Sequence, residues 1–172
     1  NDFEPGVRHT DTSVPLVWKY SSNTGEIKNN QDYYQIHSGK NLYFTGKNGH
    51  VDIQSSVNQG AGYLQFTDSY TVSTTNGSSW IGGGIIVEDG ATVNWGVNGV
   101  EGDNLHKVGS GTLVINGIGE NKGGLKVGDG LVILAQKKDN DNNIQAASSL
   151  DISSGRATVK LTDSNQINPN NI

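Results

Sequence analysis

The sequence predicts an all-β solenoid, a parallel β-helix, and three observations support this fold class. The apolar residues gather in short runs rich in β-branched side chains, such as Leu113–Ile115 and Leu131–Leu134. Gly, at 24 of 172 residues, and Asn separate these runs, and both tolerate the positive φ that tight corners need. One segment of strand, glycine corner and strand is repeated almost unchanged. Together these features predict short strands that turn at corners and stack coil upon coil.

The repeat separates a β-helix from a β-sandwich. Lys107–Ile115 (KVGSGTLVI) recurs 19 residues later as Lys126–Leu134 (KVGDGLVIL). Stacked coils place equivalent residues in equivalent environments, so their corner chemistry repeats. A sandwich pairs its strands through antiparallel hairpins and has no reason to repeat a corner. The repeat therefore favours the β-helix, with the sandwich as the alternative.

A looser rule extends the pattern: a Gly is followed by apolar residues two and four positions later. Since side chains alternate along a strand, both members of a pair are expected on one face. The pairs are Val51 and Ile53, Leu64 and Phe66, Leu113 and Ile115, Val132 and Leu134, and Ala157 and Val159. Gly90 departs from the rule by one residue, because Ala91, Val93 and Trp95 lie at odd offsets. A one-residue shift exchanges the faces, so we expect a bulge or a different corner there.

The two ends of the chain differ in texture. Residues 1–20 hold Pro5 and Pro15, followed by the large apolar Val17 and Trp18 after a polar lead. This composition predicts a connector that docks onto a folded body. Residues 21–172 are expected to be coils of the solenoid. The sequence stops where a further strand should follow, so we expect a truncated piece of a longer stalk.

Charge and composition argue against several classes of protein. The net charge is -5, and the largest basic cluster is the pair Lys137-Lys138, which acidic residues follow at once. Phosphate binding needs a clustered basic face, so no nucleic-acid partner is expected. No apolar run approaches the ~20 residues of a membrane-spanning helix, so no membrane contact is expected. The absence of Cys excludes disulfides and thiol chemistry.

The central runs resemble a known family. The segments that carry the resemblance are Trp80–Val87, Val93–Val100, Gly102–Leu113, Asn116–Gly130, Ser154–Val159 and Gln166–Ile172. They resemble the early passenger β-helix of the immunoglobulin A protease-like serine protease autotransporters, and the enterobacterial branch in particular. The resemblance implies a right-handed parallel β-helix that follows a chymotrypsin-like protease domain. It also implies serine endopeptidase action on host proteins by the parent, and secretion or display at the cell surface.

The nucleophile motif of that family, Gly-Asp-Ser-Gly-Ser, does not occur here. The nearest fragments are Gly109-Ser110-Gly111, inside the repeat, and Thr67-Asp68-Ser69-Tyr70. Neither presents a serine on the tight glycine-flanked turn that such nucleophiles need. We therefore expect no catalytic residue in this chain, and the resemblance places the catalytic residues upstream of Asn1.

No metal or cofactor is expected either. His9, His37, His50 and His106 lack the short spacings of zinc ligands. His106 aligns with Leu125 of the next copy, so strand packing is the preferred interpretation; for His9, beside Asp11, it is solvent exposure.

Asp139–Asn143 resembles the opening of a calcium loop. However, Ile144 replaces the Gly at position six and Leu150 the Glu at position twelve. A solvated turn between coils is therefore expected. Asn76-Gly77-Ser78 fits the glycosylation pattern, but it would go unused in a bacterial secreted protein.

The function expected from sequence is that of a structural stalk segment. Its expected partners are the upstream protease domain and the downstream coils, with host proteins as substrates of the parent. Core or coil-edge packing is expected of the aromatic residues Trp80, Trp95, Tyr63, Phe66 and Tyr70. Two alternatives stay open. One is a stand-alone adhesin or glycan-binding β-helix; the other is a polysaccharide lyase, for which the acids near Asp139 and the basic Arg156 would be the candidates.

Overall fold

The computed structural model describes the backbone of three short strands near the N-terminus and then residues 41–44, 49–53 and 56–168. These residues form fifteen strands in two sheets and contain no helix. The nine-stranded sheet contains β1 (Val17–Ser21), β2 (Glu26–Lys28), β3 (Tyr33–Gln35), β5 (Gly49–Ile53), β7 (Tyr70–Thr74), β9 (Thr92–Trp95), β11 (Thr112–Ile115), β13 (Gly130–Leu134) and β15 (Ala157–Leu161). The six-stranded sheet contains β4 (Leu42–Phe44), β6 (Val57–Phe66), β8 (Trp80–Val87), β10 (Asn104–Val108), β12 (Gly124–Val127) and β14 (Leu150–Ile152).

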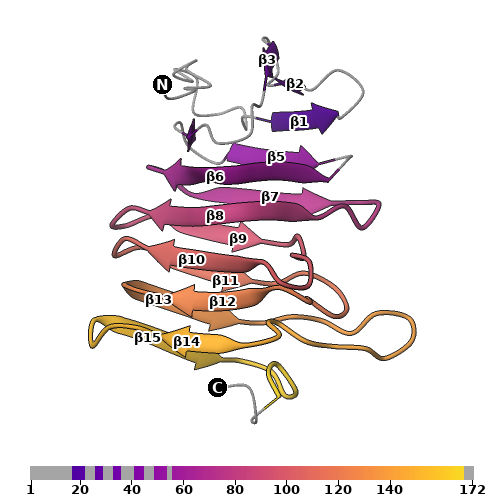
Figure 1. Cartoon of the computed structure of the whole chain (residues 1–172), viewed down its shortest axis with the longest axis vertical. Coiled ribbons are helices and arrows are strands. Elements are labelled where there is room, and N and C mark those ends of the chain that lie inside the picture. Colours follow the sequence, from indigo (N-terminus) through magenta and orange to yellow (C-terminus); the bar gives the residue numbers. More distant parts are fainter. Residues whose placement is uncertain are drawn as a thin grey trace.

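From β4 onward the chain alternates between the sheets, and each strand pairs in parallel with its counterpart in the next coil (Figure 1). This arrangement is a parallel β-helix, so the predicted fold is confirmed and the sandwich is excluded. The expected domain boundary at residue 20 falls within β1, which pairs in parallel with β5 and antiparallel with β2. The boundary itself stays a prediction, and residues 1–16 lie outside the described part.

Inward-facing side chains form continuous columns between the sheets. The glycine rule is confirmed for Val51, Leu64, Leu113, Val132 and their partners two residues later, all of which are at most 2% exposed. Ala157 and Val159, in the last described coil, are partly buried against this core. Burial of one such aliphatic or aromatic side chain stabilises the fold by roughly 1.5–3 kcal/mol.

The aromatic residues are divided between the core and the outer surface. Phe44 and Phe66, one coil apart, stack with ring centroids 4.8 Å apart. Trp80 and Trp95 are buried together, as expected, and Tyr70 also lies in the core. Tyr63 instead lies half-buried on the outer face, where its hydroxyl oxygen is 2.9 Å from that of Tyr43.

The register corrects the predicted alignment of the repeat. Between β11 and β13 the offset is 19 residues, as predicted, since Leu113 pairs with Val132. Between β10 and β12 it is 20 residues, so Lys107 pairs with Val127 and not with Lys126. His106 accordingly pairs with Lys126 rather than with Leu125. The corner between β10 and β11 holds one more residue than the next one, and this extra residue turns Lys107 inward and leaves Lys126 exposed.

The different corner expected at Gly90 is present. The Ala91 amide donates to the Glu88 carbonyl (3.0 Å), which closes a turn in which Gly90 has a φ of 78°. Ala91 then occupies the place that Gly111 takes in the next coil, and the Thr112 amide donates to its carbonyl. Val93 and Trp95 consequently face the core like Leu113 and Ile115.

A third side of the solenoid is held by isolated bridges and amide side chains. The Asn121 Oδ1 accepts the amides of Gly99 and Gly123, and its Nδ2 donates to the Ala146 carbonyl. The Gln136 Nε2 donates to the Asn98 Oδ1 at 2.9 Å. These side chains replace a continuous ladder where the coils are irregular. No helix that could cross a membrane is found among the described residues.

Candidate functional site

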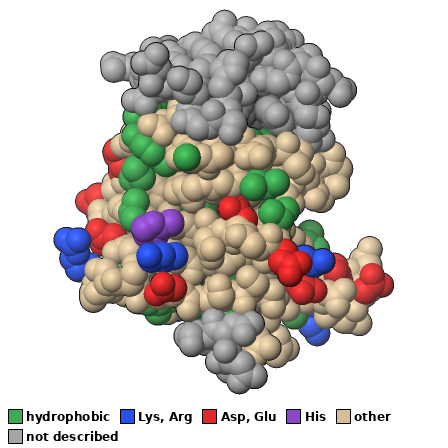
Figure 2. All heavy atoms as spheres, in the orientation of Figure 1, with side chains coloured by type: hydrophobic (Ala, Val, Ile, Leu, Met, Phe, Trp, Pro, Cys, Tyr) green, Lys and Arg blue, Asp and Glu red, His purple; other side chains and the backbone are tan. Residues whose placement is uncertain are grey.

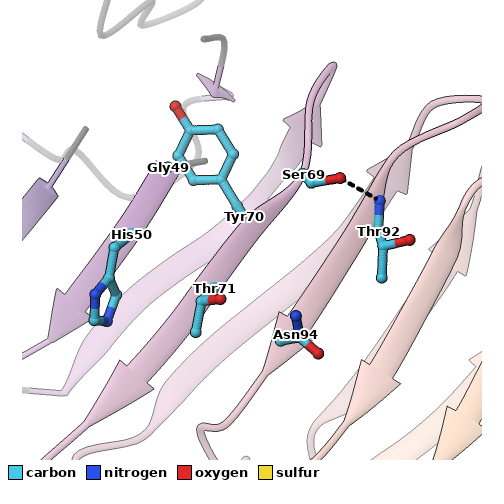
Figure 3. A pocket seen from close by; sticks show the side chains of 7 residues that line it. All are labelled: Gly49, His50, Ser69, Tyr70, Thr71, Thr92 and Asn94. Carbon is cyan, nitrogen blue, oxygen red and sulfur yellow. Dashed lines mark hydrogen bonds between the residues drawn. The ribbon is translucent and has the colours of Figure 1, made fainter. Parts of the chain in front are cut away.

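An open groove of about 400 Å³ lies on the outer face of β5, β7 and β9 (Figure 3). Its lining consists of Gly49, His50, Ser69, Tyr70, Thr71, Thr92 and Asn94. Gly49 allows this arrangement, because a Cβ there would overlap the ring of Tyr70. The Ser69 hydroxyl oxygen accepts the Thr92 amide at 3.0 Å, which ties two neighbouring coils together. The groove therefore presents mostly hydroxyl, amide and imidazole groups.

His50, on the groove wall, contacts a serine of the next coil. Its Nε2 lies 2.7 Å from the Ser73 Oγ. Asp52 is the ladder partner of Ser73, and the Asp52 Oδ1 is buried without a hydrogen-bond partner. Sequence analysis missed this cluster because 23 residues separate His50 from Ser73, and only the register between coils reveals it.

The chemistry open to this cluster is limited by its hydrogen bonds. A neutral imidazole beside a hydroxyl meets the first requirement for an activated serine. A working triad also needs an acid that orients the other ring nitrogen, together with donors for the oxyanion. Within the described residues, His50 makes only the bond to Ser73. The pair thus supplies a polar link between β5 and β7.

Lys107 forms a second unusual site, inside the solenoid. The side chain is fully buried, and its Nζ donates to the carbonyls of Gly109 (2.6 Å), Gly111 (2.6 Å) and Asp129 (2.9 Å). Burial lowers the pKa of this ammonium from 10.5 to about 8, while the nearby charge of Asp129 opposes the shift. A Cβ on Gly130 would overlap the Nζ, so the glycine of the next corner makes room for the charge.

Comparison with known proteins places this architecture. No family model matches the chain. The chain is 53% identical over its whole length to the serine protease SepA autotransporter of Shigella flexneri, and 50% identical over its whole length to the serine protease EatA of Escherichia coli O78:H11. It is 51% identical over 78% of its length to the IgA-specific serine endopeptidase autotransporter of Neisseria gonorrhoeae.

A solved structure agrees. The crystal structure of the Haemophilus influenzae Hap adhesin superposes with a TM-score of 0.83 and 32% identity, over 91% of this chain and 21% of that one. The chain belongs to the passenger β-helices of the serine protease autotransporters. It spans 13% of the length of the first two relatives and 9% of the third. The predicted location is confirmed: as an autotransporter segment it is secreted or displayed at the cell surface.

The outer face of the six-stranded sheet in this passenger segment carries a column of alternating character. Tyr63, Gly84, His106, Lys126 and Asp151 follow one another in register over five coils. Figure 2 shows a histidine, a basic and an acidic side chain in sequence down this face, next to apolar side chains. This column is solvent-facing, because the alternate residues of the same strands fill the core.

The serines weighed as nucleophiles have structural positions in the passenger segment. Ser110 lies in the corner between β10 and β11, where Gly109 has a φ of 83° and the Gly111 amide donates to the Val87 carbonyl. Ser69 lies at the groove and bonds the Thr92 amide.

The Asp139 loop of the passenger segment closes on itself. The Asp139 Oδ1 accepts the amides of Asp141 and Asn143, each at 2.9 Å. These bonds, chiefly the one from Asn143, lower the pKa of the exposed carboxyl. The carboxylate thus holds a solvated turn, as the sequence predicts. Among the described residues no three His, Asp or Glu side chains converge on a point where a metal could bind. His9 and His37 lie outside the described residues.

Proposed function

We propose that the protein to which this segment belongs is a serine endopeptidase that acts on host proteins, and that the segment joins the protease domain to the rest of the stalk. The observation that carries the proposal is the identity of 53% and 50%, over the whole segment, to two autotransporters named as serine proteases. The catalytic serine, histidine and aspartate would lie on a domain upstream of Asn1.

The segment itself is a structural stalk. Each coil bonds only to its neighbours, so stability is a sum of coil and interface terms, and a defect in one coil is felt by those that stack on it. Columns such as Val93, Leu113 and Val132 run unbroken through the described coils. A stalk of this kind supports a protease domain without contributing to its chemistry.

Sequencing upstream of Asn1 tests the catalytic part of the proposal. About 250 residues there should contain a Gly-Asp-Ser-Gly motif preceded by a histidine and an aspartate. The secreted full-length passenger should cleave one or more host extracellular proteins, and a Ser→Ala change in that motif should abolish the cleavage. A passenger without the motif and without cleavage, yet able to bind host cells, would instead support the adhesin alternative.

Two isoleucines three positions apart test the stalk role in the full-length protein. Ile115 is 2% exposed and Ile118 is 64% exposed. Ile115→Asp places a charge in the core, so it should reduce the amount of folded, protease-resistant passenger outside the cell. Ile118→Asp makes the same chemical change at the surface and should leave that amount near wild type. Equal yields from the two variants would contradict a role in which the core columns carry the stalk.

A further inference from the structure

The described residues contain three Asn-Gly dipeptides, and they lie in different surroundings. Asn76-Gly77 forms the exposed turn between β7 and β8, whereas Asn98-Gly99 and Asn116-Gly117 lie within the stacked coils. In any Asn-Gly pair the glycine nitrogen is sterically free to attack the asparagine carboxamide, because glycine has no side chain. The surroundings therefore decide which pair can react.

The turn at Asn76 holds its carboxamide oxygen among donors. The Asn76 Oδ1 accepts the Thr74 hydroxyl (2.9 Å), the Ser78 amide (3.2 Å) and the Ser78 hydroxyl (2.5 Å). The bond from the Ser78 amide closes a ring that keeps the carboxamide beside the Asn76–Gly77 peptide. Donors aimed at an oxygen that becomes negatively charged during attack stabilise the tetrahedral intermediate.

Gly77 adds mobility and access. Its φ is 74°, and nothing lies within 4 Å of the place where its Cβ would be. Asn76 and Gly77 are both exposed, so water and hydroxide reach the peptide nitrogen. The β7–β8 turn can therefore sample the geometry of attack without breaking the sheets on either side.

The other two pairs are held by the coils. The Asn98 Oδ1 accepts the Gln136 Nε2, its Nδ2 donates to the Ile118 carbonyl, and the Gly99 amide is bonded to the Asn121 Oδ1. The Asn116 amide donates to the Trp95 carbonyl, and Gly117 is buried with its carbonyl accepting the Lys137 amide. Reaction at either site requires the ladder to open first.

We propose that Asn76-Gly77 is a site of spontaneous backbone modification, in which the turn itself promotes the conversion of Asn76 to aspartate and isoaspartate. The Gly77 nitrogen loses its proton to solvent base and attacks the Asn76 Cγ. The new N–Cγ bond closes a succinimide as the Cγ–Nδ2 bond breaks and ammonia leaves with a proton. Water then opens either carbonyl of the ring and leaves one carboxylate.

The product changes the surface of the stalk. A negative charge appears at a groove of about 260 Å³ whose lining includes Thr74, Gly77, Ser78 and Ile118. The isoaspartate form also adds one methylene to the backbone of the turn, which breaks the ring closed by Ser78. The secreted passenger would thus acquire charge heterogeneity at this one turn with age.

Incubation of the secreted full-length passenger at mildly alkaline pH, followed by peptide mass spectrometry, tests the proposal. In the folded protein, Asn76 should convert at least about tenfold faster than Asn98 and Asn116, because only the latter two must wait for local opening of the ladder. In urea the three sites should converge on similar rates. Isoaspartyl methyltransferase should label the peptide that contains Asn76, and Asn76→Gln should remove that label.

Ser78→Ala separates promotion by the turn from simple exposure. It removes one donor to the Asn76 oxygen and should slow conversion in the folded protein by about threefold to tenfold, with no effect in urea. Ser78→Thr keeps the hydroxyl and should keep the rate. Conversion of Asn76 that is slower in the folded protein than in urea, or unaffected by Ser78→Ala, would overturn the proposal.

Discussion

Lys107 and Val127 are direct partners in the parallel ladder between β10 and β12, so an ammonium group and an aliphatic side chain occupy neighbouring rungs of one inward column. The corner accommodates the charge because the carbonyls of Gly109, Gly111 and Asp129 accept all three ammonium protons. This buried lysine closes the corner that holds one extra residue, as a side chain serving in place of backbone donors.

Lys107→Met should destabilise the chain by about 1–3 kcal/mol, because the buried carbonyls of the corner lose their donor. The measurement is the free energy of unfolding in urea. Lys126→Met makes the same change one coil away at an exposed position and should alter that free energy by less than about 0.5 kcal/mol. Equal effects of the two variants would contradict the role of Lys107 in the corner.

The lowered pKa of Lys107 predicts a rise of stability with pH. Burial brings the pKa to about 8 in the folded chain, against 10.5 in the unfolded chain. Between these values the unfolded chain holds a proton that the folded chain has released, so the unfolding free energy of wild type should increase with pH relative to Lys107→Met. Urea titrations across this window measure the difference. A difference that instead falls with pH would mean that the three carbonyls retain the proton more strongly than burial expels it.

Two adjacent glycines of β8 should respond oppositely to alanine. At Gly83 a Cβ would lie 2.5 Å from the Gly62 carbonyl oxygen, whereas at Gly84 the nearest atoms are an ordinary 3.5 Å and 3.7 Å away. Gly83→Ala should therefore cost about 1–3 kcal/mol through overpacking. Gly84→Ala should be neutral or stabilise by up to about 1 kcal/mol, since it restricts the unfolded chain. Thermal unfolding of the two variants gives the comparison, and similar melting temperatures would be evidence against this close coil contact.

The Asp139 turn should loosen in acid. Its carboxyl has a lowered pKa in the folded chain, so its contribution is present above the unfolded value of 3.8 and is lost as pH falls through the folded value. Hydrogen exchange of the Asn143 amide should then accelerate, relative to amides in β13, more than in the Asp139→Asn variant, whose side chain accepts bonds but does not titrate. Identical acid profiles for wild type and Asp139→Asn would contradict this.

Local pattern was sufficient for each coil but not for the relation between coils. The pairs Leu113 and Ile115, and Val132 and Leu134, face the core as predicted because alternation along a strand is a local property. The pattern Lys-Val-Gly occurs at both Lys107 and Lys126, and nothing within either copy tells which lysine is buried. The meeting of His50 with Ser73 was equally inaccessible, since it depends on the length of the coil between them.

By itself, the sequence determined an all-β solenoid, the corner at Gly90, the inward pairs and the resemblance to autotransporter passengers. Only the tertiary structure decided that Lys107 lies in the core against Val127, and that the two lysines of one repeated motif face opposite ways. The physical reason is that hydrogen bonds between coils set the register, and one extra residue in a corner exchanges the inward and outward faces of a strand.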